Sequence, residues 1–175
     1  INMFKDLLSK IKSKYTSKKE ENNYYNQLLA TTSTLKNLNP IPEITRETHE
    51  HKITYITNNS PDINKEKANL IANLIPIEET YLTTIYTKEV LTNQEYYLIP
   101  TNKYLWIINE KNYGICSYSN LIGKIIKNNL MSKTIIINNV LLEANGNDTK
   151  LQTLLSIIND PIEREKIIQE KTNYL

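Results

Sequence analysis

The cluster of side chains best suited to chemistry lies in the stretch ETHEH, residues 47–51. Alternate residues of an extended segment point to the same side, so Glu47, His49 and His51 would share one face. Histidine and carboxylate groups can bind zinc, but a zinc site needs three or four ligands in a fixed geometry. The chain has two histidines and one cysteine, and nothing in their spacing demands a metal. We therefore expect a solvated loop here, with no metal ion or other cofactor.

Cys116 is a second candidate, because a thiolate can act as a nucleophile. It lies inside a predicted strand, far along the sequence from both histidines, so we expect a packed thiol. With three glycines in all, the chain offers no loop to cradle phosphate. Carboxylate pairs lie in polar patterns typical of solvated surfaces, whereas a general acid needs burial to raise its pKa; these pairs include Glu78 with Glu79 and Glu163 with Glu165. We find no catalytic constellation and predict that the protein is not an enzyme.

Residues 3–19 have the pattern of a basic amphipathic helix. Their apolar residues recur at helical spacing, and lysines lie between them. The apolar stripe consists of Phe4, Leu7, Leu8, Ile11 and Tyr15, and the neighbouring lysines include Lys5, Lys10, Lys12 and Lys14. Such a helix can lie on an anionic membrane with its stripe at the headgroup boundary. Alternatively, the stripe packs on the protein's own body and the lysines are solvated.

A second group of lysines, Lys124, Lys127 and Lys133, lies in and beside two predicted strands, LIGKIIKNN (121–129) and SKTIIINN (132–139). Our hypothesis is that both groups of lysines contact an anion or a membrane surface. Three lysines contribute little to phosphate binding, and salt screens their effect. Alternating strand positions explain most of the tyrosines as packing residues, so nucleic acid is not an expected partner.

The elements before residue 76 are expected to be partly irregular. HKITYITNNSPD (51–62) alternates like a short strand, and INKEKANLIANLI (63–75) predicts a helix that Asp62 caps and Pro76 stops. We divide the chain into a basic amphipathic helix at 1–20, an irregular or helical extension at 21–75 and a strand-rich domain at 76–175.

Beyond residue 76, seven runs of about 5–8 residues have strand character, bounded by Asn, Gly, Ser and Lys clusters. An amphipathic helix follows, capped by Asp148 or Thr149, and Pro161 opens a second one. The apolar face of the first helix consists of Leu151, Leu154, Leu155 and Ile158.

This order resembles that of bacterial pleckstrin-homology-like (PH-like) domains over about residues 78–160. The resemblance is carried by Thr101-Asn102-Lys103-Tyr104 ahead of LWII, by YSNLIGKIIKNN (118–129) and by EANGND (143–148). It implies an α+β fold, a seven-stranded antiparallel bent sheet or barrel capped by a C-terminal helix. It also implies protein or peptide binding at sheet edges or beside the helix, and self-association as a homo-oligomer. The first strand-to-strand loop, TKEVLTNQ (87–94), has only Lys88 to offer a phosphoinositide, so that ligand is not expected.

The strand KYLWIIN (103–109) raises the question of what covers its two faces. The residues expected to face the barrel interior are Leu105, Ile107, Tyr113 and Ile115. Tyr104 and Trp106 would alternate onto the outer face. An indole there needs a cover, either from the N-terminal segment or the last helix or from a partner. Tyr104 and Trp106 are therefore interface candidates.

Composition limits the function further. Hydrophobic residues make up 39% of the 175 residues and the net charge is +2, which is typical of a globular protein. The single cysteine fits a reducing compartment, so we expect a cytoplasmic protein, with peripheral attachment to the inner face of the membrane as a variant. We predict a non-enzymatic binding or scaffold protein with a protein partner. The alternatives are a peripheral membrane protein attached by residues 3–19 and an enzyme with a His/carboxylate site.

Overall fold

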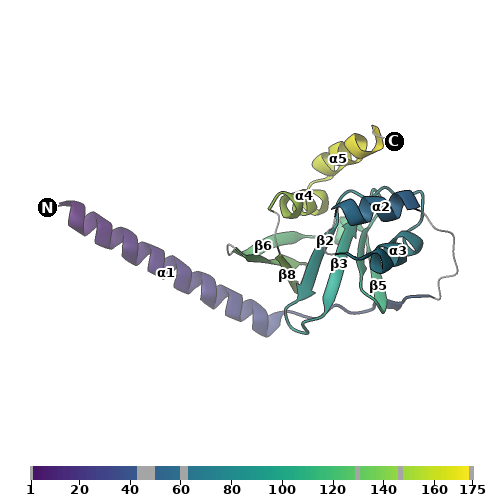
Figure 1. Ribbon diagram of the computed structural model, residues 1–175. Helices are drawn as coiled ribbons and strands as arrows, with labels where there is room; N and C mark the ends of the chain where they lie inside the picture. The colour runs from purple at the N-terminus through teal and green to yellow at the C-terminus, as the bar shows by residue number, and fades with distance from the viewer. Residues whose placement is uncertain (1, 43–49, 60–62, 129–130, 146–147, 174–175) are drawn as a thin grey trace. The chain divides into compact units, whose positions relative to one another are not determined.

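Figure 1 shows a computed structural model of the chain, which describes residues 2–42, 50–59, 63–128, 131–145 and 148–173. The chain divides into two units, Ile1–Ser33 and Thr34–Leu175. The first contains the 30-residue helix α1 (Asn2–Thr31), so the helix expected over residues 3–19 is present and longer than expected. It continues past residue 20 because residues 20–31 contain no proline or glycine. No helix in the described ranges is long and apolar enough to cross a membrane.

The second unit is built on one open antiparallel sheet, in the order β1-β5-β4-β3-β2-β8-β7-β6. Together with its helices, this sheet confirms the α+β class. The eight strands found among the described residues are β1 (Asn39–Pro40), β2 (Ile85–Glu89), β3 (Glu95–Pro100), β4 (Leu105–Ile108), β5 (Asn112–Cys116), β6 (Gly123–Asn128), β7 (Ser132–Ile137) and β8 (Val140–Asn145).

Seven of these strands, β2 to β8, correspond to the seven expected runs, although β5 begins one residue earlier than its run, and β1 is additional. It pairs with β5 at one edge of the sheet. The segment that leads into β1 is held by the buried carboxylate of Glu89, which accepts hydrogen bonds from the Leu35 amide at 2.7 Å and the Thr92 hydroxyl at 2.6 Å. Residues 34–41 therefore belong to the sheet structure.

One face of the sheet, which we call the α4 face, is covered by helix α4 (Asp148–Asn159). All four apolar residues expected on this helix are buried. The same core contains side chains from strands on both sides of β2, including Leu98, Leu105, Ile135 and Leu142. Asn159 fixes the end of α4 to the edge strand, because its amide accepts from the Gly123 N–H at 2.9 Å and donates to the Gly123 carbonyl at 2.8 Å. Helix α5 (Pro161–Asn173) follows as expected, and a short 3-10 helix, η1 (Tyr118–Asn120), precedes β6.

The opposite face, the α3 face, is covered by α2 (Glu50–Asn59) and α3 (Lys65–Leu74) (Figure 1). The strand expected over residues 51–62 is wrong, because Ile53 and Ile56 lie one helical turn apart and both bury their side chains. The cap of α3 is Asn64, whose side chain accepts from the Lys67 amide at 2.8 Å, whereas the expected cap, Asp62, lies outside the described residues.

Two of the residues expected in the barrel interior lie on the α3 face instead. Tyr113 stacks on Trp106 with ring centroids 6.0 Å apart, and Ile115 is 45% exposed. The turn between β4 and β5 places Gly114 opposite Ile107, and one step of register exchanges the two faces of a strand. The expectation was correct for Leu105 and Ile107 and wrong for Tyr113 and Ile115.

We expect the substitution Ile56→Ala to lower the free energy of unfolding by about 2–5 kcal/mol, because it leaves a cavity beneath α2. Ile56 is fully buried, whereas Thr54 on the same helix is exposed. Thr54→Ala is the matched control and should change stability by less than about 0.5 kcal/mol. Urea denaturation followed by tryptophan fluorescence measures both. Equal effects of the two substitutions would contradict the packing of α2 on the sheet.

Candidate functional site

The ETHEH cluster does not form a described site. Glu47 and His49 lie outside the described residues, and His51 is an exposed residue of α2. Within the part of the chain that the structure describes, no group of three or more His, Cys, Asp or Glu side chains is arranged to hold a metal ion.

Cys116 is half-buried at the end of β5 and packs against the α4-face core. Burial raises the pKa of its thiol, so the thiolate is scarce at neutral pH. A reactive cysteine needs the opposite environment, partly exposed and electropositive. The environment of Cys116 therefore suits packing better than nucleophilic chemistry.

The expected solvated pair Glu78 and Glu79 is divided by the fold. Glu78 is exposed, but the expectation is wrong for Glu79, which is 3% exposed. One oxygen of its carboxylate accepts hydrogen bonds from the Thr101 hydroxyl at 2.6 Å and from the Trp106 indole at 3.1 Å. The Lys52 ammonium on α2 donates to the Glu79 backbone carbonyl at 3.1 Å. Through these contacts Glu79 connects α2, β4 and the turn after β3.

The two interface candidates occupy different environments. Trp106 is 4% exposed and belongs to the core of the α3 face, so α2 and α3 supply its cover within the chain. Tyr104 is 40% exposed in the turn between β3 and β4. Only Tyr104 offers surface to a partner, because the indole is already enclosed.

The lysines of the strand region do not form one exposed patch. Lys124 is exposed and Lys127 half-buried on β6. Lys133 on β7 is 8% exposed and forms an ion pair with Asp148 at the start of α4. The charge of Lys133 is therefore already balanced within the chain. The earlier lysines lie on α1, where Lys5 is exposed and Lys10, Lys12 and Lys14 hold helical positions.

A cleft among the described residues lies where α3 meets the turn between β4 and β5. This α3 cleft has a volume of about 370 Å³ and combines an apolar floor with a polar rim. The floor consists of the half-buried Leu70 and the buried side chains of Ile71 and Ile108, and the rim consists of Asn64, Glu66, Lys67, Tyr97, Asn109 and Glu110.

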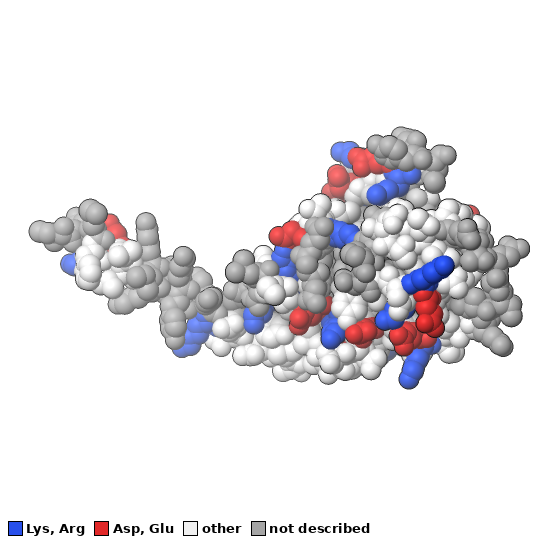
Figure 2. All heavy atoms as spheres, viewed as in Figure 1, with Lys and Arg blue, Asp and Glu red and all other residues white. Residues whose placement is uncertain are grey.

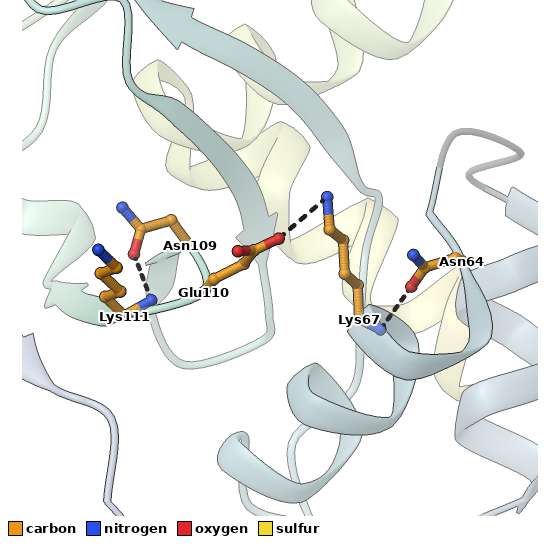
Figure 3. Close-up of polar contacts among 5 residues, drawn as sticks. All are labelled: Asn64, Lys67, Asn109, Glu110 and Lys111. Carbon is orange, nitrogen blue, oxygen red and sulfur yellow. Dashed lines mark hydrogen bonds and ion pairs between the residues drawn. The ribbon is translucent and has the colours of Figure 1, made fainter.

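Two asparagines shape the walls of the α3 cleft (Figure 3). Asn64 caps α3 from one side. On the other side, the Asn109 side-chain oxygen accepts from the amides of Lys111 at 2.9 Å and Asn112 at 2.7 Å, which closes the turn. Between the walls, the Lys67 ammonium nitrogen lies 3.5 Å from a carboxylate oxygen of Glu110. The cleft is thus bridged by one ion pair.

The Lys67 ammonium is held in its charged form. Burial works to lower the pKa of Lys67, but the Tyr97 phenol and the Glu110 carboxylate outweigh it, so the pKa of Lys67 is raised. The ammonium lies 5.7 Å from the centroid of the Tyr97 ring. The Glu110 side chain is 74% exposed, and such a pair contributes at most about 1 kcal/mol. A ligand can therefore separate Lys67 from Glu110 at small cost.

A second hollow of about 300 Å³ adjoins the α3 cleft and shares Lys67, Tyr97, Asn109 and Glu110 with it. It extends along the turn between β2 and β3 and adds Lys88, Asn93, Gln94, Glu95 and Lys111. Both signs of charge therefore line the combined surface, and Figure 2 shows them interspersed on the viewed face of the second unit. Such a surface suits a ligand that carries both charges and amide groups, such as a peptide.

Sequence inspection did not identify this cleft. Its residues come from α3, β3 and the β4–β5 turn, which are far apart along the chain. Asn109 and Asn112 are typical turn residues, but nothing in the sequence indicates that the turn NEKN (109–112) lies beside the first turn of α3.

No protein-family model matches the chain, and a search of curated proteins found no match either.

Beside Glu79 lies a buried phenol, Tyr81, which is 5% exposed. Its hydroxyl has no hydrogen-bond partner among the described residues. Burial, followed by the nearby charge of Glu79, raises the pKa of Tyr81. Tyr118 is similarly buried and its pKa is also raised by burial, but its hydroxyl donates to the carbonyls of Thr101 at 2.6 Å and Tyr104 at 2.9 Å. The two phenols are thus similarly buried and differ in whether the hydroxyl has a hydrogen-bond partner.

We expect Tyr81→Phe to stabilise the protein at pH 7 by up to about 1 kcal/mol, because it removes a buried hydroxyl that lacks a partner. Tyr118→Phe should instead destabilise it by about 1–3 kcal/mol through the lost hydrogen bonds. Urea unfolding at neutral pH measures the difference. An equal loss from both substitutions would contradict the unpartnered state of Tyr81.

The same variants test the alkaline behaviour. A phenol in the unfolded chain loses its proton near pH 10, but these phenols keep theirs to higher pH in the folded chain. The folded state then binds more protons above about pH 10, so stability falls there by about 1.4 kcal/mol per pH unit for each such phenol. Tyr81→Phe should remove the contribution of one phenol, about 1.4 kcal/mol per pH unit, from this slope. An unchanged slope would contradict the raised pKa of Tyr81.

Proposed function

We propose that the protein is a non-catalytic binding protein with a PH-like sheet, and that its α3 cleft binds a peptide segment of a protein partner. The observation that carries the proposal is the combination, in one cleft, of an apolar floor with the weakly held Lys67–Glu110 pair on its rim. Peptides present apolar side chains, charges and amides together, and each has a matching group in the cleft.

The strand order supports the PH-like assignment. Strand β2, the first of the seven expected runs, pairs with the second run, β3, and also with the last, β8. One core cluster contains Leu105 from β4 and Ile135 from β7, which lie on opposite sides of β2 in the sheet, together with Leu154 from α4. A sheet must bend for both halves to share that core. A bent sheet with a helix in its core is the arrangement that the resemblance implies.

The absence of enzymatic activity is part of the proposal. Among the described residues, the buried carboxylates of Glu79 and Glu89 both accept hydrogen bonds from groups of the sheet structure. Burial holds Cys116 as a thiol. The expectations of self-association and of a cytoplasmic location rest on the resemblance and on composition, and they stay predictions.

The cleft is tested by charge reversal at its exposed rim. Wild-type protein, Glu110→Lys and Lys67→Glu serve as baits in a crosslinking capture from the native host, with quantification of each captured protein. Glu165→Lys, an exposed position on α5, is the control with the same charge change as Glu110→Lys. We expect a partner that Glu165→Lys retains and that both cleft variants lose by about fivefold or more, because charge reversal across an interface costs on the order of 1–3 kcal/mol.

Two outcomes would contradict the proposal. If the captured partner remains on both cleft variants, the cleft is not its binding site. If no protein is captured above the level of an unrelated bait, the binding function itself is wrong. Circular dichroism of each variant confirms that the fold is intact.

A further inference from the structure

Helix α1 carries an apolar stripe that is exposed where its side chains are described. Phe4 is 69% exposed, Leu7 55% and Leu8 43%. Spacings of three and four residues place them on one side of the helix, and Ile11 and Tyr15 continue the stripe in the sequence. A contiguous exposed apolar stripe is typical of an interaction surface, since it costs free energy in water.

Lysine positions border this stripe on both sides. With 3.6 residues per turn, positions 5, 12 and 19 follow one border and positions 10 and 14 the other, while position 18 falls within the stripe, one turn beyond Tyr15. The remaining side of the helix is small and polar, with Asp6, Ser9, Ser13, Thr16 and Ser17. Lysine stems can lie along an apolar surface while their ammonium groups reach outward, so a border position lets each lysine contact a lipid phosphate.

We propose that residues 4–19 of α1 bind the surface of an anionic membrane, with the helix in the plane of the headgroups and its stripe in the acyl boundary. Charge supports this occupant, because residues 3–19 contain six lysines and one acidic residue. Apolar contact and attraction to anionic lipid act together in such helices. The attachment is separate from the α3 cleft and does not depend on what binds there.

A second copy of the helix is the main competing occupant. Phe4, Leu8, Ile11 and Tyr15 have the spacing of a coiled-coil seam. The next seam position, however, is Lys18. In a parallel pair, Lys14 of one helix would also face Lys19 of the other. Like charges in and beside the seam oppose this pairing, whereas anionic lipid neutralises them.

Vesicle co-sedimentation of the full chain tests the proposal. The probes are vesicles of phosphatidylcholine alone and vesicles in which about a third of the lipid is phosphatidylserine, at about 0.1 M and about 0.5 M salt. The triple variant Lys5→Glu, Lys12→Glu, Lys19→Glu removes one lysine border. Its matched control, Lys65→Glu, Lys103→Glu, Lys166→Glu, makes the same charge change at exposed positions of the second unit. A further variant, Leu7→Ser with Leu8→Ser, interrupts the stripe.

We expect the wild type and the matched control to bind the anionic vesicles, more weakly at high salt, and to bind neutral vesicles poorly. Each lysine near an anionic surface contributes about fivefold, so the α1 triple variant should lose about a hundredfold in partitioning. The serine variant should also lose binding. Circular dichroism shows whether each variant keeps its helix.

Three results would overturn the proposal: no binding to anionic vesicles, equal binding to both vesicle types, or undiminished binding of the α1 triple variant. Light scattering measures the solution mass and so tests whether the stripe binds a second copy of the chain instead of a membrane. A dimer that the serine variant abolishes, in a protein that does not bind vesicles, would assign the stripe to a second copy of the chain.

Discussion

Strands β3 and β4 are apolar on both faces, and covering both faces is the constraint on which the second unit depends. Alternate residues of a strand face opposite sides. Leu98 and Leu105 belong to the core of the α4 face, whereas Ile99 and Trp106 belong to the core of the α3 face. Burying each large apolar side chain contributes about 1.5–3 kcal/mol, so neither face can stay bare. Helix α4 covers one face, and α2 with α3 covers the other. Helices α2 and α3 are therefore a layer of the fold.

This second layer brings polar groups into the interior, and their contacts hold it in place. Glu79 receives the indole N–H of Trp106, and the Lys52 ammonium of α2 donates to the carbonyls of Pro76 at 3.3 Å and Glu79. Burial lowers the pKa of Lys52, against the attraction of Glu79. The same layer creates the α3 cleft, because packing α3 on β4 brings its first turn to the β4–β5 turn. The surface that we propose for peptide binding is thus a consequence of covering the outer face of the sheet.

The sequence predicted the elements whose periodicity has one interpretation. The seven strand runs are rich in β-branched and aromatic residues between clusters of turn-forming residues, and the leucines at 151, 154 and 155 fit only a helix face. Residues 51–59 fit both periods, since Ile53 and Ile56 are three apart while threonine and tyrosine between them favour a strand. Packing of Ile53 and Ile56 against the sheet favours the helix over the strand. The faces of β5 depended on the length of a turn, which propensity does not determine.

Burial of single acids was the least predictable feature. Glu79 follows Glu78 in a polar stretch, and only the three-dimensional positions of Thr101 and Trp106 explain why it is buried. The α3 cleft was missed for a similar reason, because it joins segments whose proximity comes from the packing of α3. The apolar stripe of α1 was recognisable, since a helical pattern of apolar residues and lysines needs no long-range contact.

Helices α2 and α3 cover the α3 face of β3 and β4 within the chain, and this cover can be measured directly. Trp106 is the single tryptophan of the sequence and is 4% exposed on that face, so its fluorescence reports the cover directly. We expect a blue-shifted emission and weak quenching by acrylamide in the native chain, with both lost in one cooperative transition in urea. Native emission and quenching equal to those of the urea-unfolded chain would show that α2 and α3 do not cover this face.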